Sequence, residues 1–309
     1  MSALRIGVDL GGTKIEAIAL GSGGRVLANR RLATPRGDYE ATLEAIRGLI
    51  AAIDKDIGAK ATVGLGMPGA LSPAGGPGSG TVKNSNSTWL IGKPFGRDLA
   101  RALGREVRIA NDADCFALSE ATDGAGAGAT PVFGVILGTG VGGGIVIEGR
   151  LLAGTNAIAG EWGHNPLPWP ADDERPGPPC YCGQRGCIET FVSGPGLAAD
   201  HAAAAGMETD PADIARRAGA GEQTALDSLA RYRQRLARAL AGVINILDPQ
   251  IIVLGGGLSM LPGLCEEVPA LWEGYVFSER IATKLVLAKF GDASGVRGAA
   301  WLWPEDAGS

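Results

Sequence analysis

The chain has 309 residues, which is enough for one large or two medium-sized domains with a substantial core. Its formal net charge of −5 argues against a nucleic acid or an anionic membrane as a partner. The N-terminal stretch carries Asp9 and no apolar signal segment, and no run reaches the roughly 18 apolar residues of a membrane helix. We therefore expect a cytoplasmic protein.

The first part of the chain predicts an antiparallel meander followed by a helix and a buried strand. Residues 4–10, 14–20 and 25–31 are rich in β-forming side chains and are separated by glycine turns. A helical pattern starts at Asp38, and residues 63–67 form a buried strand that ends at Pro68 and Gly69.

The same order of elements recurs later in the chain. Residues 132–137, 144–147 and 150–152 predict three strands, and residues 138–143 predict a turn. A long amphipathic helix at 226–247 then leads to a strand that ends in three glycines. This repeat predicts two similar α/β halves that present their glycine turns to each other across a cleft.

Between the two halves, a short strand at residues 105–110 gives way to a helix at Asn111 and Asp112. Asn or Asp at such a junction is a typical helix N-cap. A polar pair at the end of a strand is equally compatible with a role in catalysis.

Residues 160–189 contain a group of metal-binding side chains. The sequence has two histidines and five cysteines, and this window contains His164, Cys180, Cys182 and Cys187. Three thiolates and one imidazole form the ligand set of a closed tetrahedral zinc site. Buried or disulfide-bonded cysteines are the alternative, but Cys180 and Cys182 are too close for an easy mutual disulfide. The spacing favours structural zinc.

Two carboxylates bracket this window, Glu161 before the histidine and Glu189 after the last cysteine. Because a closed zinc site has no open coordination position, the ion would orient these glutamates towards a polar ligand and not react itself. Exposed glutamates without a function are the alternative.

Two glycine turns each join a pair of strands. Residues 9–14 read Asp-Leu-Gly-Gly-Thr-Lys, and residues 138–143 read Gly-Thr-Gly-Val-Gly-Gly. Such turns free backbone N–H groups for phosphate, although a plain Gly-Gly hairpin also explains the first one. The second turn matches G-x-G-x-x-G, but a strand follows it and not the helix that a dinucleotide site requires. We expect two phosphate-binding hairpins and neither a Rossmann nor a P-loop site.

Together these motifs resemble the ROK family of sugar kinases over essentially the whole chain. The resemblance is carried by residues 9–14, 111–112, 138–144, 161–164 and 180–189. It implies an α/β fold of the duplicated actin-like ATPase (ribonuclease H-like) type, with two lobes, a central cleft and a structural zinc loop. It also implies ATP, Mg²⁺ bound with ATP, and structural Zn²⁺.

The resemblance further implies roles for individual residues. Asp112 would be the general base, and Asp9 would organise Mg²⁺. The sugar-binding residues would be Gly69, Asn86, Asn111, Glu161, His164 and Glu189. The nucleotide-binding residues would be Asp9, Gly11, Gly12, Thr13, Lys14, Gly138, Thr139, Gly140, Gly255, Gly256 and Gly257. The zinc ligands would be His164, Cys180, Cys182 and Cys187.

The same resemblance predicts the domain boundaries. An N-terminal lobe would span residues 1–113 and be joined by a C-terminal helix at 296–309, and a larger C-terminal lobe would span residues 114–295. One departure is the 15-residue stretch between His164 and Cys180, which is longer than in many relatives. Sugar contacts from residues 165–179 are therefore left open.

Residues 84–90, 160–169 and 294–303 resemble bacterial fructokinases of the mannofructokinase kind. We therefore expect ATP-dependent phosphorylation of fructose to fructose 6-phosphate. A glucose, mannose or N-acetylhexosamine kinase with the same machinery is the alternative, and a non-catalytic sugar sensor or repressor is a further one. A repressor would need a helix-turn-helix before the first strand, where eight residues precede Asp9. The resemblance also implies a homodimer.

Overall fold

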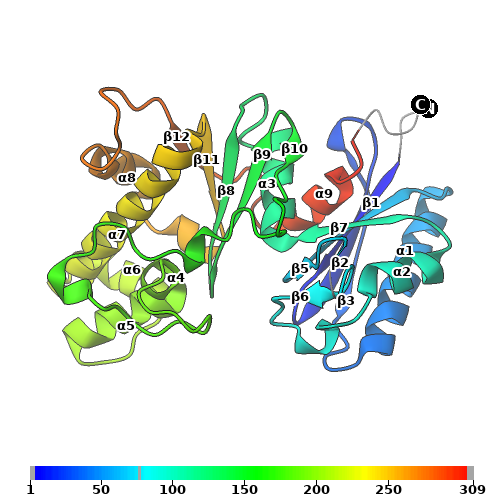
Figure 1. The fold of residues 1–309 in the computed structure, drawn as a ribbon, viewed down its shortest axis with the longest axis horizontal. Helices are drawn as coiled ribbons and strands as arrows, with labels where there is room; N and C mark the ends of the chain where they lie inside the picture. Colours follow the sequence, from blue (N-terminus) through cyan, green and yellow to red (C-terminus); the bar gives the residue numbers. More distant parts are fainter. Residues whose placement is uncertain (1–3, 76–77, 305–309) are drawn as a thin grey trace. The chain divides into compact units, whose positions relative to one another are not determined.

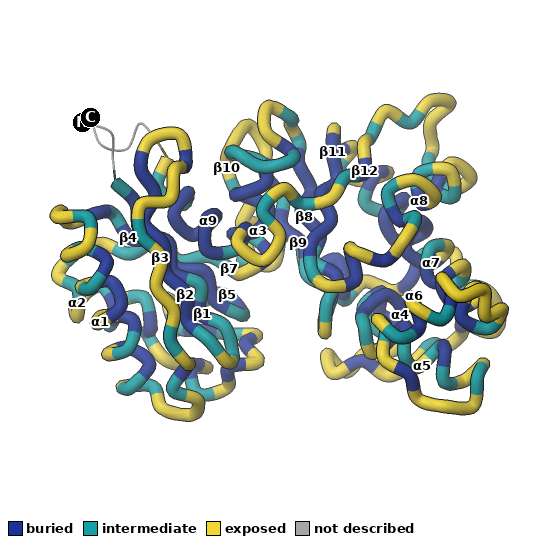
Figure 2. Tube along the Cα trace, turned by 180° about the vertical axis from the view of Figure 1, so that it is seen from behind, coloured by how far each residue is buried: buried dark blue, intermediate teal, exposed yellow. Residues whose placement is uncertain are grey.

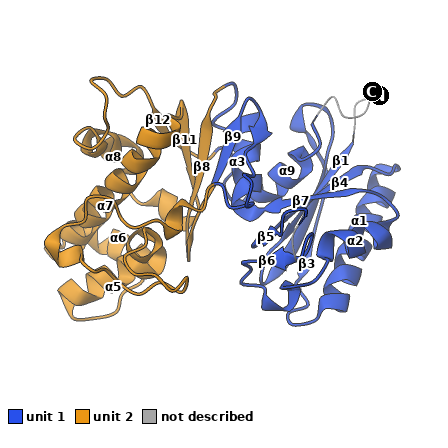
Figure 3. Cartoon of the chain, in the orientation of Figure 1, with its two compact units in different colours: residues 1–128, 144–159, 289–309 blue, residues 129–143, 160–288 orange. Residues whose placement is uncertain are grey.

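The computed structural model describes residues 4–75 and 78–304. Within these residues the chain forms two compact units (Figure 3). The first unit contains residues 1–128, 144–159 and 289–309, and the second contains residues 129–143 and 160–288. The lobe boundaries at 113/114 and 295/296 were predicted from the resemblance to the kinase family, whereas these two units are defined by how compactly the chain packs. The lobe boundaries therefore stay a prediction. Residues 305–309 of the predicted C-terminal helix lie outside the described residues.

The first unit is built on a five-stranded sheet with the order β3-β2-β1-β4-β7 (Figure 1). Its strands are β1 (Arg5–Leu10), β2 (Lys14–Leu20), β3 (Val26–Ala33), β4 (Thr62–Met67) and β7 (Val107–Asn111). The β1-β2-β3 meander is antiparallel, whereas β4 pairs in parallel with both β1 and β7. A small second sheet pairs β5 (Ala70–Leu71) with β6 (Val82–Lys83).

The helices of this unit are α1 (Tyr39–Ile57), α2 (Phe95–Leu103), α3 (Asp112–Thr122) and α9 (Ser294–Trp301). Asp38 caps α1 by accepting a hydrogen bond from the Ala41 N–H at 2.9 Å. Gly58, with a φ of 68°, ends this helix in the left-handed conformation. The buried residues Ile46 and Ile50 of α1 belong to the core formed with the sheet.

Helix α9 is buried in the first unit, where it packs on β1, β4 and α3 (Figure 2). Glycines make this close packing possible. A Cβ atom on Gly7 would lie 2.0 Å from the Val296 carbonyl oxygen, and one on Gly64 would lie 1.8 Å from that of Ala299. A Cβ atom on Gly298 of α9 itself would lie 1.6 Å from the Cys115 carbonyl oxygen. No larger residue fits these three positions without moving the helix.

The second five-stranded sheet has the order β10-β9-β8-β11-β12. Its strands are β8 (Val132–Leu137), β9 (Val141–Ile147), β10 (Arg150–Leu151), β11 (Ile251–Gly255) and β12 (Lys284–Leu287). Strand β11 pairs in parallel with β8 and β12. The helices of the second unit are α4 (Glu189–Val192), α5 (Gly194–Ala205), α6 (Pro211–Gly219), α7 (Gln223–Leu247) and α8 (Leu264–Trp272).

Both sheets therefore consist of a three-stranded meander extended by two further strands in the same order, which confirms the predicted duplicated α/β fold. Several details differ from the prediction. Strand β9 begins at Val141 and not at Gly144, because the glycines permit close packing inside a strand: a Cβ atom on Gly143 would lie 2.7 Å from Trp162 Cδ1. Several elements were not predicted, namely α2, α4, α5, α8, β5, β6 and β12. Strand β12, for example, spans four residues and has no clear alternation.

No helix among the described residues is both long enough and apolar enough to span a membrane.

Candidate active site

The turn between β1 and β2 is held in one conformation by its neighbours. The Gly11 N–H donates to the Lys14 carbonyl oxygen at 3.0 Å. Thr34 then binds the turn twice, through its hydroxyl to the Gly11 carbonyl oxygen at 2.7 Å and through its N–H to the Thr13 carbonyl oxygen at 3.0 Å. A glycine turn fixed in this way is suited to an anion, because its backbone does not have to reorganise on binding.

Two acidic residues lie at strand ends in the same unit, Asp9 on β1 and Asp112 after β7. Burial is the main reason why the pKa of Asp9 rises from 3.8 to about 6, and the negative charge of Asp112 adds to it. Lys14 acts in the opposite direction. A partly desolvated carboxylate next to a second one is stabilised by a cation, and carboxylate oxygen is a ligand that Mg²⁺ prefers. The residues thus fit the predicted Mg²⁺ role.

Asn111 and Asp112 form the start of α3. The side-chain oxygen of Asn111 accepts a hydrogen bond from the Ala113 N–H at 2.8 Å, so Asn111 is an N-cap. Its amide nitrogen donates to the Gly69 carbonyl oxygen at 3.1 Å. Asp112 also accepts from the Ala113 N–H, at 2.8 Å, and its side chain is exposed. Asn111 caps the helix and Asp112 lies exposed next to it, so helix capping and the predicted catalytic role are compatible.

Gly69 also contacts the segment that contains Asn86. A Cβ atom on Gly69 would lie 2.5 Å from the Lys83 carbonyl oxygen, and its φ of 85° favours glycine. Asn86 is exposed between the buried residues Ser85 and Ser87. The first unit therefore positions the predicted base together with three of the predicted sugar-binding residues.

The second unit contains the predicted metal cluster. The ligand atoms of His164, Cys180, Cys182 and Cys187 all lie within 4.8 Å of one another. The closest approaches are 3.6 Å between Cys180 Sγ and His164 Nδ1, and 3.6 Å between Cys182 Sγ and Cys187 Sγ. Two thiolates on one tetrahedral zinc ion are about 3.8 Å apart, whereas a disulfide measures about 2.05 Å. The four side chains therefore fit zinc, and the three cysteines form no disulfide.

Backbone pairing brings the two ends of this loop together. The Leu167 N–H donates to the Gly186 carbonyl oxygen at 2.9 Å, and the Ile188 N–H donates to that of Asn165 at 2.8 Å. These bonds place His164 beside Cys187 although 22 residues separate them in the sequence. The ligand set is thus assembled by the backbone as well as by the cysteines.

Glu189 has an unexpected partner. Its Oε2 atom accepts a hydrogen bond from the Val141 N–H at 2.9 Å, and it would lie 2.8 Å from a Cβ atom on Gly140. The carboxylate after the last cysteine therefore rests on the turn between β8 and β9. Glu161 precedes the short helical turn Trp162–His164 and is exposed. The indole of Trp162 fixes this turn by donating to the Gly142 carbonyl oxygen at 3.0 Å.

A cavity of about 850 Å³ lies in the second unit next to the same turn. Of the predicted nucleotide-binding residues, Gly138, Thr139 and Gly257 line it. Gly140 contacts Glu189 instead, and Gly256 packs against Leu137, whose carbonyl oxygen would lie 2.4 Å from its Cβ atom. Sequence reasoning missed several lining residues: Pro195, Ala198, Asp210, Ala212 and Met260. They lie on elements with no motif, and only the fold brings them together.

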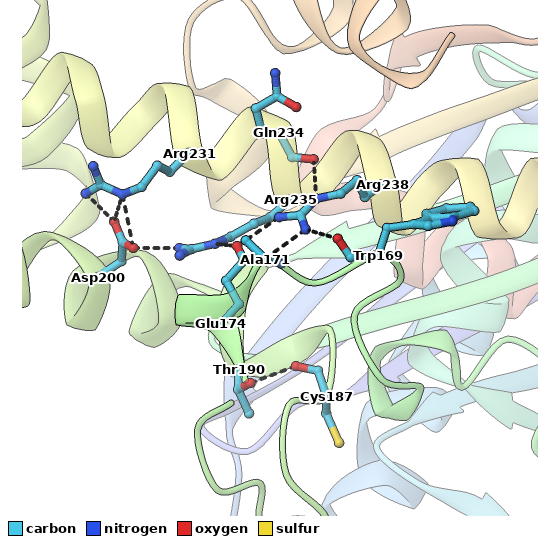
Figure 4. Close-up of polar contacts among 10 residues, drawn as sticks. All are labelled: Trp169, Ala171, Glu174, Cys187, Thr190, Asp200, Arg231, Gln234, Arg235 and Arg238. Carbon is cyan, nitrogen blue, oxygen red and sulfur yellow. Dashed lines mark hydrogen bonds and ion pairs between the residues drawn. The ribbon is translucent and has the colours of Figure 1, made fainter. Parts of the chain in front are cut away.

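The stretch between His164 and Cys180 is anchored by a buried ionic network (Figure 4). Glu174 binds Arg235 and Arg238 with bonds of 2.8 Å, and Arg235 continues to Asp200 at 2.6 Å. Burial alone would raise the pKa of Glu174, but the hydrogen bonds from Arg238 and Arg235 outweigh it and lower the pKa to about 2. Because both arginines belong to α7, the longer loop is fixed to the main helix of its unit.

Comparisons with known proteins agree with this architecture. The family model described as the ROK family matches residues 5–306. The N-acetyl-D-glucosamine kinase of Vibrio vulnificus is 40% identical over 96% of this chain and 98% of its own length. The enzyme of the same name from Vibrio cholerae is 41% identical with the same coverage.

Solved structures show the same relationship. The ROK hexokinase of Thermus thermophilus has a TM-score of 0.85 and is 32% identical over 96% of both chains. A ROK family glucokinase from Streptomyces griseus, solved with glucose and AMPPNP, has a TM-score of 0.74 and is 28% identical over 97% of this chain and 99% of its own. The chain belongs to the ROK family.

Proposed function

We propose that this protein transfers a phosphoryl group from MgATP to a hexose and that fructose is its preferred acceptor. Kinase activity is supported by the family and by relatives of nearly equal length, whose names describe sugar kinases. The sequence of residues 84–90, which adjoins Gly69 in the first unit, supports fructose through its resemblance to fructokinases.

In this proposal Asp112 accepts the proton of the attacking sugar hydroxyl. Phosphoryl transfer needs little covalent help from the protein, so positioning and charge neutralisation provide most of the catalysis. We assign sugar contacts to Asn111 and Gly69 in the first unit and to Glu161, His164 and Glu189 in the second. The backbone of the two glycine turns and the Lys14 ammonium group contact the phosphates, and the 850 Å³ cavity takes the nucleoside.

Asp9 would hold Mg²⁺, and His164, Cys180, Cys182 and Cys187 would hold zinc. The magnesium ion would neutralise charge on the ATP phosphates, whereas the zinc ion would keep the sugar-binding loop in shape. Zinc with four protein ligands leaves no position for substrate. The chain's own contribution is therefore to keep His164 and Glu189 in fixed positions through the loop they belong to.

N-acetylglucosamine is the second candidate acceptor, and it is favoured by the names of the relatives at about 40% identity. Acceptor choice depends on a few pocket residues, so overall identity does not decide it. A non-catalytic sensor has less support, because the base and both glycine turns are present in this sequence.

We also propose a homodimer. Phe277 and Ile246 are 100% and 89% exposed, and Asn245 holds their segments together through bonds of 2.8–2.9 Å to the Phe277 N–H and the Tyr275 carbonyl oxygen. Apolar side chains gathered in this way are typical of a contact surface. Light scattering should give about twice the monomer mass for the wild type. Phe277→Asp should lower the measured mass to that of one monomer.

The acceptor is tested by measuring ADP release with saturating MgATP and fructose, glucose, mannose or N-acetylglucosamine. We expect the highest kcat/KM for fructose. A higher kcat/KM for N-acetylglucosamine would show that fructose is not the preferred acceptor, while the proposed kinase activity would stand. No turnover with any of the four sugars would overturn the proposed function.

A further inference from the structure

The cavity of about 850 Å³ beside the β8–β9 turn has a lining that is apolar apart from two side chains. Asp210 carries the one charged side chain among the described residues that line it, and Thr139 carries a hydroxyl group. The other lining residues are glycine, alanine, proline, leucine or methionine. A nucleotide base can pack against small apolar residues, whereas the hydroxyl groups of a nucleoside need polar partners. None of the roles above uses Asp210.

Asp210 lies close to the turn to which we assign phosphate contacts. Gly194 connects the two places, because its N–H donates to the Gly138 carbonyl oxygen at 2.8 Å. A Cβ atom on Gly194 would lie 3.3 Å from that same oxygen and 3.7 Å from Cγ of Pro211, the residue after Asp210. In a nucleoside triphosphate the ribose joins the phosphates to the base. The ribose is therefore the part of the nucleoside that lies nearest to phosphates held by this turn, and Asp210 is beside it.

Asp210 has one structural task, which leaves part of its carboxylate available. Its Oδ1 atom caps α6 by accepting a hydrogen bond from the Asp213 N–H at 3.0 Å. The arginines of this helix pair with Asp213: Arg217 Nε lies 3.0 Å from its Oδ2 atom, and Arg216 Nε lies 2.9 Å from its Oδ1 atom. Within the part of the chain that the structure describes, no ion pair involves Asp210, and its side chain is exposed. A carboxylate can accept several hydrogen bonds, so the cap does not use up its capacity.

The charge of Asp210 decides which part of a nucleotide it can contact. A carboxylate repels phosphate, so the start of α6 does not attract the phosphates although it is a helix N-terminus. It accepts hydrogen bonds from neutral donors, which in adenosine are the ribose hydroxyl groups and the amino group of the base. Guanine also presents donors that suit a carboxylate. The position beside the phosphate turn favours the ribose over either base.

We propose that Asp210 accepts a hydrogen bond from a ribose hydroxyl group and so makes the enzyme prefer ribonucleotides to deoxyribonucleotides as phosphoryl donors. The proposal rests on the kinase function above and on the placement of the nucleoside in this cavity. It assigns donor specificity to a residue that no sequence motif marks.

The test compares wild type with Asp210→Ser, in which serine still caps α6 but the carboxylate is lost. Calorimetry measures the binding of ADP, 2′-deoxy-ADP and 3′-deoxy-ADP in the presence of Mg²⁺. We expect wild type to bind at least one deoxynucleotide about 10- to 100-fold more weakly than ADP, the usual effect of losing a hydrogen bond to a charged group. In Asp210→Ser, ADP binding should weaken by a similar factor, and the three nucleotides should bind within about threefold of one another. A purely structural role as a cap would leave the ratios unchanged.

Asp38→Ser is the matched control, because Asp38 caps α1 of the first unit by the same kind of bond, at 2.9 Å to the Ala41 N–H. It should keep the wild-type ratios. Equal binding of the three nucleotides by wild type, or a preference for ADP that persists in Asp210→Ser, overturns the proposal. GDP is measured in parallel, and a preference for GDP over ADP that disappears in Asp210→Ser would assign the carboxylate to the base and overturn the ribose contact.

Binding is measured without turnover, so the ribose contact is judged separately from the kinase function. A wild type that binds ADP with the expected preference but phosphorylates no hexose supports the contact and overturns the kinase function. Phosphorylation of a hexose with unchanged nucleotide ratios in Asp210→Ser supports the kinase function and overturns the contact.

Discussion

The turns β1–β2 and β8–β9 occupy corresponding places in the two sheets but are built differently. The first has charged residues of its own, Asp9 before it and Lys14 after it. The second has none, and the carboxylate of Glu189 from the metal loop binds its Val141 N–H. We assign phosphate contacts to both turns, but the first has its own charged residues beside it, whereas the second is hydrogen-bonded to the loop with the predicted sugar ligands. Two turns at corresponding places in the duplicated fold therefore differ in the side chains that surround them.

Changing Asp112 gives the largest expected effect on kcat, because Asp112 is the proposed general base. The first unit carries this base, and we assign no equivalent to the second unit. Asp112→Asn should lower kcat by about 10² to 10⁴, since it removes a general base without changing the side-chain shape. Sugar binding should persist in calorimetry. Asp56→Asn on α1, which loses a partly exposed ion pair with Arg30 of β3, is the matched control. A variant that keeps more than a tenth of wild-type kcat would exclude Asp112 as the base.

The predicted metal site is a feature of the second unit. Within residues 4–75 and 78–304, one cluster of three or more candidate ligands is close enough to hold an ion. Removing one of its ligands tests the site. Cys182→Ser should lower zinc content well below one per chain. The sugar KM should rise on the order of 10- to 100-fold, because the loop loses its support. Mass spectrometry of the native protein and sugar titrations measure both.

Cys265→Ser is the control for this experiment, because Cys265 lies on α8 outside the cluster. Full zinc occupancy and unchanged kinetics in the Cys182 variant would refute the metal site.

Gly140→Ala tests the coupling between the second turn and the metal loop. The new Cβ atom would lie 2.8 Å from Glu189 Oε2, so the carboxylate must move and its bond to the Val141 N–H weakens. A hydrogen bond of this kind contributes about 1 kcal/mol, so kcat/KM should fall about three- to tenfold. Gly48→Ala on α1, where a Cβ atom meets nothing within 4 Å, should leave it unchanged. Equal activities would show that Glu189 and the turn are not coupled.

The last prediction concerns stability and not activity, and it follows from the pKa of Asp9, which is raised from 3.8 to about 6. The folded state binds this proton more tightly than the unfolded state, so the free energy of unfolding falls as the pH rises from about 4 to about 6 and stays lower above that. Asp9→Asn removes the penalty, which is at most about 3 kcal/mol. The melting temperature should rise by several degrees at pH 8 and by less at pH 5. An equal shift at both pH values would contradict the raised pKa.

Local patterns in the sequence predicted much of this arrangement. Alternation located β1 and β2, and a helix was predicted to start at Asp38. Asn111 was recognisable as a cap, and the cysteine spacing located the cluster now seen around His164. Contacts between distant residues left no such trace. Nothing in the sequence connects Glu174 with Arg238, 64 positions later, or Glu189 with Val141. Fructose specificity was also predicted from local similarity, and the relatives do not support it because their names indicate a different acceptor.

The close packing of α9 against Gly7, Gly64 and Cys115 has a consequence for biosynthesis. Strands β1 and β4 leave the ribosome early, yet the helix that covers them is translated after residue 293. The apolar face of β1 and β4 that α9 covers in the folded protein therefore stays uncovered while the second unit is synthesised. Nascent chains stalled before Ser294 should bind a general chaperone, and release should coincide with the arrival of α9.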